Sequence, residues 1–113
     1  MIALVFSYDV RDRDAFEQAY GADGEWAAFF RGAPGYVGTE LLRDVEIPGR
    51  YLVVDRWASA EAYNAFAGAH RDEYMRRVDE TRFHYEQELR LGTFENVWPE
   101  PPEAENRPAQ TDV

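Results

Sequence analysis

The order in which two hydrophobic periods follow one another is the feature that most constrains the fold of this 113-residue chain. Apolar residues that alternate with period two are typical of strands, and apolar residues three or four apart are typical of amphipathic helices. Along the chain these periods predict strand, helix, strand, strand, helix and strand. A chain of this length holds about one domain with one modest core.

The first half of the chain is predicted to contain three strands and one interrupted helix. Alternating apolar residues predict a strand at 2–9, and helical spacing predicts a helix over 12–31. The glycines in the segment 21–24 are expected to kink or break that helix. Strands are predicted at 36–45 and 51–57, and the Ile-Pro-Gly turn signal between them predicts a hairpin.

The second half is predicted to contain two helices. Ser59 is expected to cap a helix at 60–67, because a Ser side chain can accept a hydrogen bond from a free N–H of the first turn. A longer helix is predicted at 71–80, and Gly68 is expected to mark the joint between the two.

A final strand follows Thr81, where the hydrophobic period changes to two. Gly92 is expected to form a bulge, with residues 93–97 as a short extra strand. Strict alternation places one set of side chains on one face: Phe83, Tyr85, Gln87, Leu89 and Leu91. The opposite face then carries His84, Glu86, Glu88 and Arg90.

This order of elements is that of a ferredoxin-like α+β domain, a βαββαβ antiparallel sheet with helices on one face. The first and third strands are apolar on both faces, as where Leu52 and Val54 oppose Tyr51. A second copy of the same face is the expected cover, which gives a homodimer of the dimeric α/β-barrel kind. The domain is assigned to 1–97, and the Pro-rich acidic segment 98–113 is expected to be a disordered tail.

Composition excludes several classes of function. The formal charge is −10, from 22 acidic and 12 basic residues, which disfavours a nucleic-acid partner. The absence of Cys removes disulfides and thiolate metal sites. The N-terminus has neither a signal peptide nor a membrane span, so a cytoplasmic protein without a membrane partner is expected. An aromatic content of 15% indicates a ligand cavity or a large interface.

Three segments carry a resemblance to a known family: RGAPGY at 31–36, VDRWASAEAY at 54–63 and HYE at 84–86. Over residues 2–97 the chain resembles the antibiotic biosynthesis monooxygenase (ABM) superfamily of small dimeric α/β-barrel proteins. That superfamily includes cofactor-independent monooxygenases that oxidise polycyclic aromatic phenols to quinones, haem-degrading enzymes, and many proteins with no known substrate.

The resemblance implies a set of pocket residues. In quinone-forming relatives a Trp at the end of the third strand, an aromatic hydroxyl on the next helix and an Arg further along line the substrate pocket. Trp57, Tyr63 and Arg76 or Arg77 occupy the matching places. Those relatives also use an Asn four residues before the Trp, where this chain has Val53.

Cofactor-free reaction with dioxygen requires a substrate that ionises, a base, a donor that holds the anion, and a dry aromatic slot. The base is expected to be His70 or His84. The candidate catalytic residues are Trp57, Tyr63, His70 and Arg77. The candidate substrate-binding residues are Tyr8, Phe66, Tyr74 and Arg76. Each role has a simpler alternative: core packing for the aromatics, ion pairs for the arginines, and a surface or capping role for His70.

Metal and haem sites are the remaining alternatives. His84 and Glu86 are expected to share one face of the last strand, and His70 could supply a third metal ligand. A solvated face or a dimer rim explains the two strand residues more simply, so no metal is assigned. Haem-degrading relatives use an Asn, a Trp and a ligating His, where this chain has Ser7 or Tyr8, Phe66 and Arg76.

The predicted function is therefore a homodimeric monooxygenase, without a cofactor, that acts on a hydrophobic aromatic or polyketide-like phenol or anthrone and forms a quinone. The alternatives are a non-catalytic protein that binds a quinone-type molecule, a haem-binding or haem-degrading monooxygenase, and an isomerase or cyclase.

Overall fold

A computed structural model describes residues 1–97, and the tail predicted at 98–113 lies outside the described residues. The elements follow one another in the order β1 (Ile2–Val10), α1 (Arg13–Tyr20), α2 (Glu25–Phe30), β2 (Tyr36–Arg43), β3 (Arg50–Trp57), α3 (Ala60–Ala69), α4 (Arg71–Thr81), the 3-10 turn η1 (Arg82–His84) and β4 (Tyr85–Glu95). None of the helices within residues 1–97 has the length and hydrophobicity of a membrane-spanning segment.

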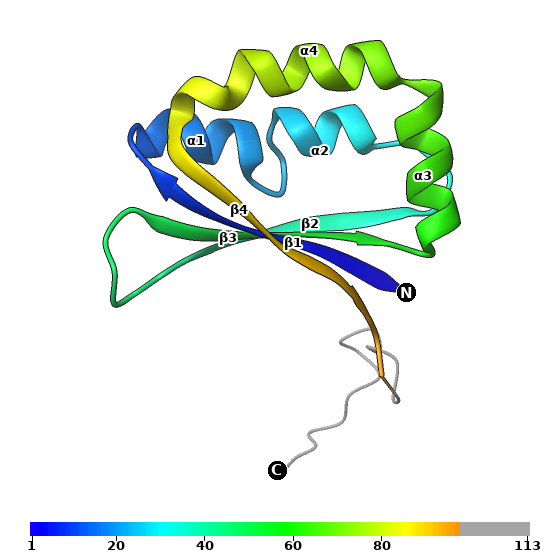
Figure 1. Cartoon of the computed structure of the whole chain (residues 1–113), viewed down its shortest axis with the longest axis horizontal. Helices are drawn as coiled ribbons and strands as arrows, with labels where there is room; N and C mark the ends of the chain where they lie inside the picture. Colours follow the sequence, from blue (N-terminus) through cyan, green and yellow to red (C-terminus); the bar gives the residue numbers. More distant parts are fainter. Residues whose placement is uncertain (98–113) are drawn as a thin grey trace.

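The four strands form one antiparallel sheet in the order β2-β3-β1-β4. The helices lie together on one face of this sheet, and the described part of the chain leaves the other face uncovered (Figure 1). Each helical connection joins strands that are not neighbours in the sheet, so the helices must pass over the sheet and cover it. The predicted ferredoxin-like α+β fold is confirmed.

The predicted break in the first helical segment is confirmed, because α1 ends at Tyr20 and α2 begins at Glu25. Gly24 lies so close to α1 that a Cβ atom there would be 2.5 Å from the carbonyl oxygen of Gln18. Ser59 caps α3 as predicted, since its Oγ accepts a hydrogen bond of 3.1 Å from the N–H of Ala62.

The joint between α3 and α4 lies at His70 and not at Gly68, where the sequence predicted it. His70 has φ −120° and ψ 32°, and it is both the C-cap of α3 and the N-cap of α4. Gly68 lies inside α3, because a single glycine costs a helix only about 1 kcal/mol and does not by itself end it.

The predicted assignment of side chains to the two faces of the last strand is wrong in part. Residues 82–84 form a 3-10 turn, so β4 begins at Tyr85 and runs unbroken to Glu95. Its pairing with β1 shifts twice, and the first shift lies between Asp9, opposite Gln87, and Val10, opposite Tyr85. This extra residue returns Tyr85 and Glu88 to the same, helix-covered face. The predicted bulge at Gly92 is confirmed by the second shift, where the glycine has φ 150°.

The core fills the space between the sheet and the helices as two adjoining groups of side chains. One gathers around Phe16 and Tyr51, and the other around Phe30 and Trp57. The uncovered sheet face is also apolar: Leu42, Leu89 and Phe94 are 50%, 54% and 52% exposed. The structure therefore agrees with the prediction of a sheet that is apolar on both faces.

Candidate functional site

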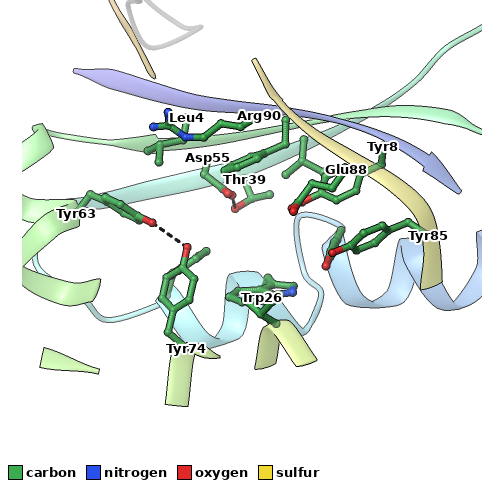
Figure 2. A pocket seen from close by; sticks show the side chains of 15 residues that line it. Leu4, Tyr8, Trp26, Thr39, Asp55, Tyr63, Tyr74, Tyr85, Glu88 and Arg90 are labelled. Atoms are coloured by element: carbon green, nitrogen blue, oxygen red, sulfur yellow. Dashed lines mark hydrogen bonds between the residues drawn. The ribbon is translucent and has the colours of Figure 1, made fainter. Parts of the chain in front are cut away.

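A cavity of about 300 Å³ lies between the sheet and the helices, and every strand and every α-helix contributes to its wall (Figure 2). This volume is at the lower end of the range for small-molecule pockets. Its lining is mainly aromatic and aliphatic: Leu4, Phe6, Tyr8, Tyr20, Trp26, Phe30, Thr39, Val53, Asp55, Tyr63, Tyr74, Val78, Tyr85, Glu88 and Arg90.

Asp55 is the acidic group on the β3 side of this cavity. It follows Val53 on the inward face of β3, and its Oδ1 accepts a hydrogen bond of 2.7 Å from Thr39 Oγ1. Since Thr39 has one hydroxyl proton, the 2.6 Å contact between Tyr36 and Thr39 has the Tyr36 hydroxyl as donor. Burial raises the pKa of Asp55 to about 6, although the Thr39 hydrogen bond acts in the opposite direction.

Two tyrosine hydroxyls meet on the helical side of the cavity. Tyr63 on α3 and Tyr74 on α4 lie 2.8 Å apart, oxygen to oxygen (Figure 2). Burial is the main reason that the pKa of Tyr74 is raised, so its hydroxyl keeps its proton. Both side chains also line a shallower hollow on the outer surface, beside Arg71 and Met75. The pair is therefore a wall between the cavity and solvent.

A second acidic group enters the cavity from β4. Tyr8 donates a hydrogen bond of 2.6 Å to Glu88 Oε2, and burial raises the pKa of Tyr8. The ring of Tyr8 lies 5.1 Å from that of Tyr20 and 4.9 Å from that of Tyr85, between centroids. This part of the cavity is a group of tyrosine rings around one carboxylate.

The structure brings three of the candidate residues to the cavity: Tyr8, Tyr63 and Tyr74. Trp57 is fully buried in the core beneath, 5.5 Å from Phe30 and 5.4 Å from Tyr63 between ring centroids, and it does not line the cavity. Within residues 1–97 its indole N–H is buried without a hydrogen-bond partner.

Three other candidates, Phe66, His70 and Arg77, line a separate hollow between α2 and the α3–α4 pair. The imidazole of His70 lies 4.5 Å from the ring of Phe66, between centroids. The guanidinium of Arg77 lies 4.6 Å from the centroid of Phe29 and donates a hydrogen bond of 3.0 Å to Glu73. The four candidate catalytic residues therefore lie in three places. Trp57 is in the core, Tyr63 lines the cavity, and His70 and Arg77 line the separate hollow.

Arg76 is 60% exposed and forms two ion pairs of 3.9 Å, with Glu73 and Glu80. His84 belongs to η1, before β4 begins, so it does not share a strand face with Glu86. Across residues 1–97 no three His, Asp or Glu side chains gather where they could hold a metal ion.

Asp55 and Glu88 were not among the candidates that the sequence suggested. The sequence did contain a signal for Asp55. It is the one acidic residue in a row of alternating β3 residues that otherwise point into the core: Tyr51, Val53 and Trp57. Glu88 has no such signal. Strict alternation places it on the face opposite Tyr85, and only the bulge in β4 brings it inward.

Comparison with known proteins agrees with this architecture. The sequence profile of the antibiotic biosynthesis monooxygenase family matches residues 1–76. The chain belongs to this family. Among solved structures, the chain is similar to SnoaB of Streptomyces nogalater, a cofactor-independent oxygenase, with a TM-score of 0.67 and 21% identity over 88% of this ABM chain and 97% of that one.

Haem-degrading relatives are also similar. MhuD of Mycobacterium tuberculosis, solved with two haems in its active site, has a TM-score of 0.60 and 24% identity over 86% of this chain and 96% of that one. Likeness at these identities shows a shared fold. A mycobilin-producing haem oxygenase of the same organism is 49% identical over 35 residues, and the match spans 31% of this chain and 33% of the relative's length.

The cavity residues do not fit a haem. A haem iron needs an axial ligand such as His, Cys, Met or a tyrosinate. The residues that line the cavity include no His, Cys or Met. Burial raises the pKa of Tyr8, Tyr20 and Tyr74, which opposes the ionised form that binds iron. His70 lies at the other hollow.

Proposed function

We propose that this ABM protein is a cofactor-independent monooxygenase that oxidises an aromatic or polyketide-like phenol or anthrone to a quinone with dioxygen. The observation that carries the proposal is a carboxylate, Asp55, whose pKa is about 6 and which faces an aromatic cavity. Membership of the family supports the reaction class. The Val53 position, where quinone-forming relatives use an Asn, is an apolar part of the same wall.

Asp55 is the proposed base. Dioxygen reacts slowly with closed-shell organic molecules, so the substrate must first become an electron-rich anion. A carboxylate with a pKa of about 6 is a stronger base than an ordinary aspartate and is still ionised at neutral pH. The substrate loses two hydrogens in all. One oxygen atom of dioxygen becomes the new carbonyl and the other leaves as water, so no external reductant is needed.

The Tyr63–Tyr74 pair is the proposed donor for the substrate anion. Two hydroxyls that share one hydrogen bond use one proton between them, so the accepting hydroxyl keeps its own proton. That proton is available to an oxygen atom in the cavity, where both residues form part of the wall. Trp26 and Phe30 supply ring faces for stacking.

Oxygen uptake with a panel of anthrones and polycyclic phenols tests the proposal. The wild type is expected to consume dioxygen, and Asp55→Asn to lower the rate by about 100-fold or more, since a positioned base contributes about that factor. Glu40→Gln is the matched control, because Glu40 is 56% exposed and forms an ion pair of 3.4 Å with Arg56 on the surface. Full activity in Asp55→Asn would refute the assignment of the base. Tight binding without oxygen uptake would instead favour the non-catalytic binding protein.

Haem degradation is the second candidate, and the short segment that is 49% identical to a haem oxygenase favours it. Because the cavity lacks a suitable ligand, added haemin is expected to give no Soret shift. A shifted Soret band that disappears in His70→Ala would overturn this expectation and would favour a haem site at the hollow beside Phe66.

We also propose that the functional unit is a homodimer formed through the uncovered sheet face, and that residues 1–97 are its functional domain. Leu42, Leu89 and Phe94 would be buried there by the same face of a second copy. Gel filtration with light scattering tests the dimer, and a stable monomer would refute it. A chain that ends at residue 97 is expected to keep its oxygen uptake.

A further inference from the structure

We propose that the cavity accepts neutral hydroxylated aromatics and discriminates against aromatic carboxylic acids, because its lining holds carboxylates from two different strands, Asp55 and Glu88. This inference rests on the proposed function for the identity of the ring system, and it adds the charge of the substrate. Asp55 enters from β3 and Glu88 from β4, on the same helix-covered face of the sheet (Figure 2).

The charge of Asp55 has little compensation from the protein. Within residues 1–97, its one hydrogen bond is the 2.7 Å contact from Thr39, and it has no ion pair. Its Oδ2 is therefore free to accept a hydrogen bond from a ligand. A desolvated carboxylate is stabilised most by a ligand that donates a hydrogen bond to it, and a second anion does not stabilise it.

Glu88 is the second carboxylate of the lining, and unlike Asp55 it is an exposed residue. Its Oε2 accepts the hydrogen bond from Tyr8, and in the described part of the chain it has no ion pair. Burial and the neighbouring Tyr63 hydroxyl are the larger causes of the raised pKa of Tyr74, and both carboxylates add to it. Two negative charges therefore act on one hydroxyl of the cavity wall, and a ligand that arrives as an anion would meet both. A neutral substrate that transfers its proton to Asp55 leaves that carboxyl uncharged, so its anion does not meet the same repulsion.

Arg90 is the one cation among the lining residues, and it does not reverse this balance. Its guanidinium donates a hydrogen bond of 2.5 Å to Thr93 Oγ1, and the residue is exposed, as Glu88 is, so the buried carboxylate of Asp55 has no cation of its own in the lining. With both acids ionised, the lining carries a net charge of −1. Repulsion between like charges is strongest where water is excluded, so a ligand carboxylate would be disfavoured in the interior.

Ligand hydroxyls suit the same groups. A phenolic O–H can donate to Asp55 or to Glu88, and its oxygen can accept from the Tyr63–Tyr74 pair. The ring faces of Trp26 and Phe30 then contact the aromatic system. The chemical class that satisfies both the carboxylates and the apolar wall is an uncharged polyhydroxylated aromatic.

The test measures dissociation constants for three matched compounds: a dihydroxyanthraquinone, its monocarboxylic acid and the corresponding carboxamide. The carboxamide has nearly the bulk of the acid without its charge. Quenching of Trp fluorescence reports binding, since Trp26 lines the cavity. Because these quinones are already oxidised, binding does not depend on turnover, and failure of the oxidation proposal would leave this result intact.

The wild type is expected to bind the carboxamide about tenfold or more tightly than the acid, and the double variant Asp55→Asn, Glu88→Gln to reduce that ratio to about threefold or less. Glu40→Gln, on the outer surface, is expected to keep the wild-type ratio. Binding of the acid that equals or exceeds binding of the carboxamide would overturn the proposal. If Arg90→Gln then weakened binding of the acid, Arg90 would be the group that holds the ligand carboxylate. A preference that persists in the folded double variant, or failure of the neutral compound to bind, would also overturn the proposal.

Discussion

Replacement of Asp55 by Asn is expected to stabilise the protein at neutral and alkaline pH although it removes the proposed base. Asn has nearly the shape of Asp and can still accept the hydrogen bond from Thr39. It carries no charge, so the cost of holding an ionised carboxylate in the aromatic cavity disappears. Stability gained at the expense of activity is typical of a functional site.

The magnitude follows from the pKa. The ordinary value for the carboxyl is 3.8, and in the folded protein the value is about 6. At about 1.36 kcal/mol for each pKa unit, the folded state favours the protonated form by about 3 kcal/mol. The folded pKa is raised, so ionisation destabilises the fold. The cost is absent below pH 3.8, grows as the pH rises through 6, and is complete above that value.

Urea unfolding of the wild type and Asp55→Asn, at equal protein concentration and over a range of about pH 4 to 8, measures this difference. The two free energies of unfolding are expected to agree at the acid end, and the variant to be more stable by up to about 3 kcal/mol at the alkaline end. The exposed substitution Glu40→Gln controls for loss of a carboxylate and is expected to change stability by about 0.5 kcal/mol or less. A variant that is less stable at pH 8, or a difference that does not change with pH, would refute the reasoning.

Three further predictions concern the core, a turn and the uncovered face. Trp57→Phe is expected to lower the free energy of unfolding, because the ring is fully buried. The variant is expected to keep its rate of oxygen uptake within about threefold of the wild type, and a rate about 100-fold lower would show that Trp57 is a catalytic residue. Gly35→Ala is expected to lower the free energy of unfolding in urea more than Gly32→Ala. The backbone strain is the same at both sites, where φ is 90° and 91°, but only at Gly35 would the new Cβ lie 2.5 Å from another side chain. Equal losses of stability in the two variants would contradict the steric reason. Phe94→Glu is expected to give a monomer in light scattering, because a charge would be buried on the proposed dimer face, and an unchanged dimer would place the interface elsewhere.

The elements of the fold could be predicted because their signals are local. The side chain of every second strand residue points to the same face whatever the rest of the chain does, and the register of β1 with β3 preserves that alternation from Ile2 to Asp9. Ser59 caps its helix through an N–H three residues away. Such contacts need no knowledge of distant segments.

The prediction for β4 failed in part for the opposite reason. A bulge depends on how a strand pairs with its neighbour, and the shift opposite Asp9 and Val10 has no marker in the residues of β4 itself. Strict alternation therefore assigned Glu88 to the wrong face. The glycine at the second shift does mark its site, and there the bulge could be predicted.

By itself the sequence determined the order of the elements, the fold, the apolar character of both sheet faces and the resemblance to the family, because each depends on periodicity or on short local motifs. Only the tertiary structure decided which side chains meet in the cavity. It assigns Trp57 to the core, His70 and Arg77 to another hollow, and Asp55 and Glu88 to the cavity wall. Membership of a cavity depends on packing between segments that are far apart in the chain, and no local pattern encodes that packing.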